Sequence, residues 1–190
     1  MSNAKQRLIQ IRVVTNDQRA FTLIELLVTI AIATIIMAIA VPSMTSFLGN
    51  NRVAATTNTL VHSLQTARAE AIKRSSPVGL CTTNTPTDPA ASCDAGAGYS
   101  SGWIVYSDDD RNGSRTAGEA IIHSSEAVSP AFAFTPTLQL SDQVYFNDSG
   151  GSVTPVGLPI SGSINISYAG GEEVRNVLVS ANGRISTETP

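Results

Sequence analysis

The amino-acid sequence predicts an α+β fold, in which a long N-terminal helix has a transmembrane first half and a second half packed on antiparallel β-sheets. Three observations lead to this prediction. Residues 21–41 form an apolar run, an amphipathic stripe follows, and the remainder consists of short β-rich stretches broken by Gly, Pro, Asn, Asp and Ser. Strands spaced in this way suit antiparallel sheets rather than βαβ units.

The apolar run from Phe21 to Val41 contains 21 residues and a single charged side chain, Glu25. A helix of that length extends roughly 32 Å, enough to cross a ~30 Å hydrocarbon core. An ionised carboxylate at the centre of such a segment costs up to about 2.5–3.5 kcal/mol, and somewhat less near the end, where Glu25 lies. Because such a charge is usually tolerated only where it finds a partner, Glu25 is a candidate functional residue.

The residues around Glu25 resemble the signal of type IV pilins and type II secretion pseudopilins, a basic leader and a small residue followed by Phe-Thr-Leu-Ile-Glu-Leu. Here Ala20 precedes that hexapeptide at residues 21–26. The resemblance implies a leader peptide of residues 1–20, cleavage by a prepilin peptidase between Ala20 and Phe21, and methylation of the new amine. It also implies that Glu25 pairs with the Phe21 ammonium of a neighbouring subunit. One departure is Ala20 itself, since the family strongly prefers Gly there.

Two other interpretations of the apolar run stay open. Ala38-Ile39-Ala40 matches the A-x-A cleavage site of an ordinary secretory signal, and the run also suits a simple single-pass anchor. The run is longer than the ~7–15 apolar residues of a secretory signal and contains Glu25, which favours the pilin interpretation.

Charge is divided unevenly along the 190 residues, whose formal net charge is −3. The leader carries +3, which leaves −6 for the rest of the chain. With the resemblance, this asymmetry predicts a single-pass protein of the bacterial inner membrane, with a cytoplasmic N-terminus and a periplasmic C-terminal domain, later part of a pilus or pseudopilus. An acidic exported domain is poorly suited to non-specific binding of the phosphate backbone of a nucleic acid.

The helix is expected to continue through its amphipathic half, residues 42–75, to a length of about 54 residues. Pro42 stands where pilins commonly place a helix-kinking proline, and a bend is plausible at residues 49–51. Basic side chains near residue 74 favour the negative pole of the helix dipole, and Pro77 ends the helix. The apolar or small residues at three- and four-residue steps are Phe47, Leu48, Val53, Thr57, Leu60, Val61, Leu64, Ala67, Ala71 and Ile72.

Residues 76–190 are expected to form one β-rich periplasmic domain. The segments 84–101 and 148–161, rich in small and polar residues, are expected to be exposed loops. The predicted strands are 77–83, 102–107, 119–125, 131–139, 143–147, 162–168, 173–180 and 184–188.

Several stretches of this domain resemble the GspH/FimT branch of minor pilins. In that branch a Gly-Trp strand leads into an Asn-Gly turn, a Gly-Glu strand follows, and a hairpin ends the domain. The matching stretches of this chain are residues 102–108 for the first strand, 112–113 for the turn, 118–122 for the second strand and 180–185 for the hairpin. The resemblance implies that the β domain has two sheets. It also implies three kinds of partner: other pilins or pseudopilins through the N-terminal helix, the prepilin peptidase, and membrane lipid.

Cys81 and Cys93 both fall in the part predicted to be exported. An oxidising compartment favours a disulfide that closes a short loop, with a chain-entropy contribution of roughly 3 kcal/mol. Zinc is the alternative, although two thiols without a nearby histidine do not supply four ligands.

Residues 108–119 match the spacing of an EF-hand-type calcium loop. Asp108, Asp110, Asn112 and Glu119 offer the oxygens that Ca²⁺ prefers, and Gly113 permits the sharp turn. The flanking segments are predicted strands rather than helices, so an acidic hairpin turn with Asp side chains capping backbone amides is the alternative. Apart from this calcium candidate, no cofactor is expected.

Arg184 raises the alternative of DNA binding. Some members of the FimT-like branch bind DNA through a C-terminal Gly-Arg-x-Arg element, and here Gly183-Arg184 is followed by Ile185 and Ser186, so the second arginine is missing. Arg175, Arg111 or Arg115 are candidates to add charge nearby. The opposing interpretation is that Arg184 is a solvated arginine after a turn glycine.

Catalysis has no support in the sequence. His62 and His123 are expected to be packing or surface residues, and no arrangement of Ser, His and Asp or of paired carboxylates stands out. The sequence therefore predicts a minor pilin or pseudopilin that is not an enzyme. The alternatives are a DNA-binding minor pilin for natural transformation and a membrane-anchored, calcium-binding periplasmic module without a filament role.

Overall fold

The computed structural model describes residues 21–189, except for the side chain of Pro42, and divides the chain into one compact unit that ends at Ala40 and another that begins at Val41. Residues 1–20, including the predicted leader and Ala20, lie outside the described residues. The helices and strands are α1 Leu23–Arg74, β1 Val78–Thr82, η1 Tyr99–Ser101, β2 Trp103–Ser107, β3 Ile121–Ser125, β4 Phe132–Pro136, η2 Leu138–Leu140, β5 Gln143–Phe146, β6 Ser152–Val153, β7 Gly162–Tyr168, β8 Arg175–Val179 and β9 Ile185–Glu188.

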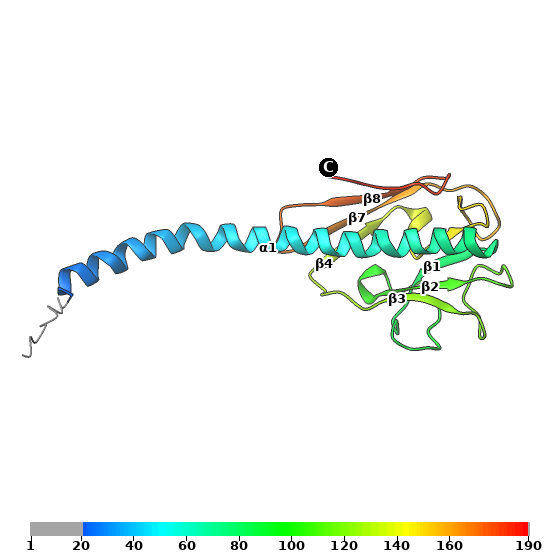
Figure 1. Ribbon diagram of the computed structural model, residues 1–190, viewed down its shortest axis with the longest axis horizontal. Coiled ribbons are helices and arrows are strands. Elements are labelled where there is room, and N and C mark those ends of the chain that lie inside the picture. Colours follow the sequence, from blue (N-terminus) through cyan, green and yellow to red (C-terminus); the bar gives the residue numbers. More distant parts are fainter. Residues whose placement is uncertain (1–20, 190) are drawn as a thin grey trace, which may run out of the picture. The chain divides into compact units, whose positions relative to one another are not determined.

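The strands form two antiparallel sheets, as predicted. One has the order β3-β2-β1-β5-β6 and the other the order β4-β7-β8-β9. The part of α1 that follows Val41 runs along both sheets (Figure 1). The predicted α+β architecture of a long helix on a two-sheet domain is confirmed.

The core lies where α1 meets the two sheets. Six of the ten residues of the predicted stripe are fully buried, and these buried residues pack with side chains from both sheets. Phe47, Leu48 and Ile72, which were also assigned to the stripe, are about half exposed (59%, 46% and 48%). The buried stripe consists of Val53, Thr57, Leu60, Leu64, Ala67 and Ala71.

The single tryptophan joins the helix to the first sheet. Trp103 of β2 is fully buried, and its indole N–H donates a hydrogen bond of 2.9 Å to the Ser63 hydroxyl on α1. Tyr99 stacks on Phe134 at a ring distance of 5.9 Å and donates its hydroxyl proton to the Leu140 carbonyl. These contacts connect both sheets around one aromatic cluster.

α1 continues without interruption through residues 49–51, where the sequence suggested a bend. Gly49 instead permits close approach of the turn between β7 and β8, since a Cβ at this position would lie 2.5 Å from the Gly170 carbonyl oxygen. The Asn50 side chain accepts hydrogen bonds of 3.1 Å from the backbone N–H groups of Glu172 and Glu173. The Gly-Asn pair thus anchors the helix to the second sheet.

The predicted loops and one strand need correction. The 84–101 segment is only partly exposed, since Ala91 and Tyr99 are each 1% exposed. The 148–161 segment contains the two-residue strand β6, too short to leave an alternating pattern. The strand predicted at 131–139 ends at Pro136, and a 3₁₀ turn follows.

Candidate functional site

The N-terminus of α1 begins with a side-chain cap. Thr22 precedes the first helical residue, and its hydroxyl accepts a hydrogen bond of 3.2 Å from the Glu25 backbone N–H. The Thr22 carbonyl accepts the first helical hydrogen bond from Leu26 at 3.1 Å. Thr-x-x-Glu is the sequence pattern of a capping box, so the motif that carries the charge also starts the helix.

Glu25 is exposed, and its carboxylate has no hydrogen-bond or ion-pair partner among residues 21–189. Apolar side chains along this half of α1 are exposed as well, from Leu23 at 77% to Ile39 at 72%. Within the described residues, one helix is long and apolar enough to cross a membrane by length and composition, with a mean hydropathy of 2.6 in its most apolar window. Glu25 thus presents an unpaired carboxylate on an exposed apolar surface of the helix.

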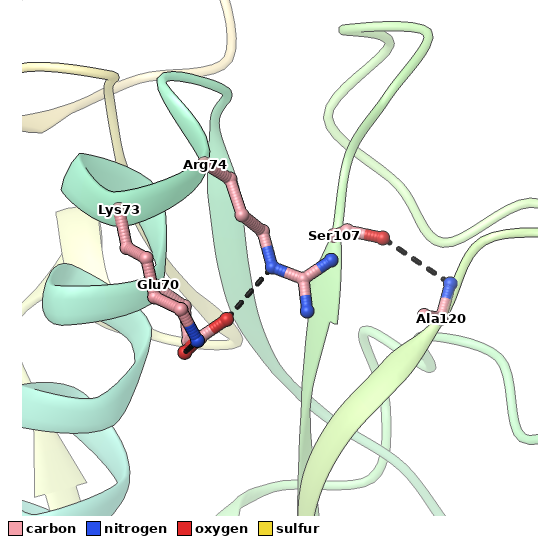
Figure 2. A network of polar contacts seen from close by, with 5 residues as sticks. All are labelled: Glu70, Lys73, Arg74, Ser107 and Ala120. Atoms are coloured by element: carbon pink, nitrogen blue, oxygen red, sulfur yellow. Dashed lines mark hydrogen bonds and ion pairs between the residues drawn. The ribbon is translucent and has the colours of Figure 1, made fainter.

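The other end of α1 carries the ion pairs expected of a helix C-terminus. Glu70 accepts from Lys73 at 2.8 Å and from Arg74 at 2.7 Å, and these hydrogen bonds hold the pKa of Glu70 below its usual range (Figure 2). The same view shows Ser107, whose hydroxyl accepts a hydrogen bond of 3.2 Å from the Ala120 N–H. This bond closes the stem of the acidic hairpin between β2 and β3.

Two buried carboxylates organise the acidic hairpin. Glu119 is 6% exposed and accepts from the N–H groups of Asp109 at 2.8 Å and Thr116 at 2.7 Å. Asp108 is fully buried and accepts hydrogen bonds from the N–H groups of Asn112 at 3.1 Å and Gly113 at 2.9 Å. These are the amide-capping contacts of the hairpin-turn interpretation.

A tyrosine completes the environment of Asp108. The Tyr145 hydroxyl donates a hydrogen bond to this carboxylate. Burial raises the pKa of Asp108, and burial together with the neighbouring Asp108 raises the pKa of Tyr145, which keeps the phenol protonated as a donor.

The same loop brings together the predicted calcium ligands. Ligand oxygens of Asp108, Asp110 and Glu119 lie within 4.8 Å of one another. The fourth predicted ligand, Asn112, uses its side chain within the loop instead. Its amide nitrogen donates to the Asp110 carboxylate at 2.7 Å, and its amide oxygen accepts from the Ser114 N–H at 2.7 Å. The three carboxylates could hold a cation, although backbone N–H groups already satisfy the two buried ones.

The predicted disulfide is confirmed: Cys81 and Cys93 are joined, with a Cα–Cα distance of 5.5 Å. Arg115 fixes the loop that the disulfide closes, since its guanidinium donates to the carbonyls of Ala91 at 2.7 Å and Pro89 at 3.2 Å. A third bond of 3.1 Å reaches the Glu119 carbonyl. Arg115 therefore has a structural role and is not a free cation.

Arg184 follows a tight hairpin turn. The Gly183 N–H donates to the Ser180 carbonyl at 2.7 Å, and Gly183 has a φ of 76°, a left-handed conformation that favours glycine. Arg184 is exposed, and its guanidinium has no partner within residues 21–189. Arg175 pairs with Glu173 at 2.5 Å, so it adds little charge to an anion-binding surface.

Arg68 of α1 holds this turn in place. Its guanidinium donates to the Gly150 carbonyl at 3.0 Å and to the Asn182 carbonyl at 3.3 Å. In the sequence, Arg68 is only one of several basic side chains in the last third of the helix, and the two partners of its guanidinium lie 82 and 114 residues away.

The two histidines meet between α1 and β3. The rings of His62 and His123 lie edge to face with centroids 5.7 Å apart. Burial, with His62 as a second cause, lowers the pKa of His123. This packing role agrees with the sequence-based expectation, although nothing in the sequence paired the two residues.

The fold and the apolar helix with its unpaired glutamate define the class of membrane-anchored pilin-like subunits. Residues 15–41 match the prokaryotic N-terminal methylation motif. Residues 56–183 match the family described as type II transport protein GspH, and the chain belongs to this family. Together these matches support the role of a type IV minor pilin or pseudopilin.

Solved structures show the same fold. The chain is similar to the type IV minor pilin FimU of Pseudomonas aeruginosa strain PAO1, with a TM-score of 0.54 and 18% identity over 76% of this chain and 96% of FimU. A second crystal form of FimU gives a TM-score of 0.51 and 18% identity, covering 72% and 96%. Comparison with curated proteins gave no match.

Proposed function

We propose that this chain is a minor pilin or pseudopilin that enters the inner membrane with its N-terminus in the cytoplasm and its β domain in the periplasm. A prepilin peptidase cleaves it between Ala20 and Phe21, and the new Phe21 amine is methylated. The processed subunit then joins a type IV pilus or a type II secretion pseudopilus. Its role is structural, without catalysis.

The observation that carries this proposal is the unpaired carboxylate of Glu25 on an exposed apolar helix that matches the methylation motif. In lipid, a carboxylate without a partner raises the free energy of the inserted helix. Cleavage creates an ammonium at Phe21, one turn before Glu25. Pairing of Glu25 with the Phe21 ammonium of an adjacent subunit would neutralise both charges in a medium where their attraction is far stronger than in water.

Substitution of Glu25 by Ala tests the proposal. We expect the Glu25→Ala protein to insert and to be cleaved, because removing a charge makes the helix more apolar. It should accumulate in the membrane and be absent from sheared filaments, and Glu25→Gln should behave in the same way. Thr29→Ala, one turn further along the same helix, is the matched control and should enter filaments normally. Normal filament entry of Glu25→Ala would show that Glu25 does not recruit the subunit.

The mass of the mature protein tests processing separately. Protein isolated from its native membrane should begin with N-methylated Phe21, and Ala20→Gly should speed its appearance because the peptidase family prefers glycine there. A mature protein that begins at Val41 would instead identify an ordinary secretory signal.

A further inference from the structure

A groove runs between one face of α1 and the last strand, β9. From α1 it is lined by Gln65, Arg68, Ala69 and Ile72, whose spacing of three and four residues places them on one side of the helix. From β9 and the residue before it come Ile185 and Arg184. The cavity has a volume of about 430 Å³ and an apolar floor.

The rim of this groove carries two guanidinium groups without a carboxylate partner among residues 21–189. Arg68 uses its N–H groups on the backbone carbonyls of Gly150 and Asn182, which leaves its charge uncompensated. Arg184 extends from a turn that Arg68 itself fixes, and no side chain of the described protein pairs with it. The groove therefore presents positive charge on a unit that is acidic overall.

The strand that contributes Ile185 to the groove, β9, also has an open backbone edge. β9 is the terminal strand of its sheet and pairs with β8 through Leu178↔Ser186 and Val179↔Ile185. The Ser180 N–H donates to the Arg184 carbonyl, so the residues that face β8 on this strand are Arg184, Ser186 and Glu188. By the alternation of an antiparallel ladder, the N–H and C=O groups of Ile185 and Thr187 point away from β8, toward the open edge.

We propose that this groove binds an extended, carboxylate-bearing segment of another subunit of the same assembly. The segment adds to the edge of β9 as a further strand, through hydrogen bonds to Ile185 and Thr187. One of its Asp or Glu side chains lies between Arg68 and Arg184, and an apolar side chain lies on the groove floor.

The surface suits a peptide better than a nucleic acid. Two guanidinium groups beside an apolar floor, one of them already hydrogen-bonded to backbone carbonyls, offer little to a phosphate backbone, whereas an open strand edge and an apolar groove are what an extended peptide recognises. The identity of the donor as another subunit rests on the proposed function.

Site-specific cross-linking of the full chain in its native membrane tests the inference. A photoreactive benzoylphenylalanine in place of Gln65 should cross-link to an exported protein with its own N-terminal methylation motif. The linked peptide should contain Asp or Glu. The same probe in place of Ser124, exposed on β3, should not give this product. Cross-links to DNA alone, or none, would overturn the proposal.

Two substitutions separate charge from strand addition. Arg184→Glu should lower the cross-linking yield by about tenfold, because it replaces attraction by repulsion. Arg111→Glu, an exposed arginine outside the groove, should leave the yield unchanged. Thr187→Pro removes an outward N–H without touching the β8 ladder and should also lower the yield, whereas Thr187→Val should not.

Failure of the inference can be told apart from failure of the proposed function. Trp103 fluorescence and the intact disulfide verify folding of each variant. If Glu25→Ala blocks filament entry while Arg184→Glu and Thr187→Pro cross-link normally, the groove is not a docking site, although the pilin role stands. If Glu25→Ala enters filaments normally, only the recruiting role of Glu25 fails. If the unmutated protein is itself absent from filaments and begins at Val41, the proposed function fails, and the identity of the cross-linked partner then tests the groove by itself.

Discussion

Removal of the Cys81–Cys93 disulfide should destabilise the β domain by about 3 kcal/mol. The two cysteines are separated by 12 residues, and the loop-closure entropy that the cross-link removes from the unfolded chain gives this value at 25 °C. For a domain of about 150 residues, each kcal/mol corresponds to roughly 2–4 °C in Tm. We therefore expect the double variant Cys81→Ala/Cys93→Ala to melt about 6–12 °C below the unmutated protein.

The assay uses the full chain in detergent micelles. Its single tryptophan, Trp103, is fully buried in the β domain, so the fluorescence change on heating follows that domain rather than the membrane helix. Reductant should lower the Tm of the unmutated protein to that of the double variant, which should itself be insensitive to reductant.

Hydrogen bonds give the loop a second source of order. Thr82 accepts from the Asp94 N–H at 2.9 Å and donates its hydroxyl to the Asp94 carbonyl at 3.0 Å, while Arg115 holds two further carbonyls of the loop. Arg115→Ala should therefore cost more in the double variant than in the unmutated protein. If the double variant Cys81→Ala/Cys93→Ala melts within about 2 °C of the unmutated protein, the reasoning is refuted, because these hydrogen bonds alone then hold the loop.

Three further predictions concern the same domain. Because backbone N–H groups already satisfy Asp108 and Glu119, millimolar Ca²⁺ should raise Tm by less than about 1 °C; a larger rise that Asp110→Ala abolishes would establish a calcium site. Burial raises the pKa of Asp108 in the folded protein above the ordinary value of 3.8. The stability that protonated Asp108 contributes is therefore fully present below pH 3.8 and is lost as the pH rises through the pKa of the folded protein. The Tm of the unmutated protein minus that of Asp108→Asn should accordingly fall as pH rises, and a constant or growing difference would contradict this assignment. Ser63→Ala leaves the buried Trp103 N–H without its acceptor and should cost about 1–3 kcal/mol, measured by denaturant unfolding against the exposed control Thr59→Ala, whereas equal stability of the two variants would show that water replaces Ser63.

Much of the architecture follows from local patterns. The apolar run, the stripe from Phe47 to Ile72 and Pro77 beyond its end predict a helix close to the observed Leu23–Arg74. Most strands lie within the predicted ranges, because alternating or apolar runs bounded by turn residues report local conformation directly. The pattern Thr22-x-x-Glu25 also predicts the helix cap, which gives Glu25 a local role in addition to its charge.

What lies outside those patterns depends on contacts between distant segments. Whether Tyr99 lies in an exposed loop or in the core depends on Phe134 and Leu140, which belong to elements later in the chain. Two-residue β6 exists because Phe146 and Tyr145 of β5 supply its partners. Neither feature has a local periodicity that a reader of the sequence could detect.

Local sequence is enough to predict the long helix, the strand-rich domain, the disulfide and Glu25 as the candidate for assembly, since each depends on neighbouring residues or on the compartment that the first 41 residues predict. The folded arrangement is needed to see that Arg68 supports the turn before Arg184 and that Arg115 belongs to the disulfide loop. Those pairings follow from strand order and from the path of α1 over two sheets, and many side chains of the same charge could have filled either role. A guanidinium donates to whichever carbonyls the folded chain brings within about 3 Å of it, and the residues next to it in the sequence do not predict which carbonyls these are.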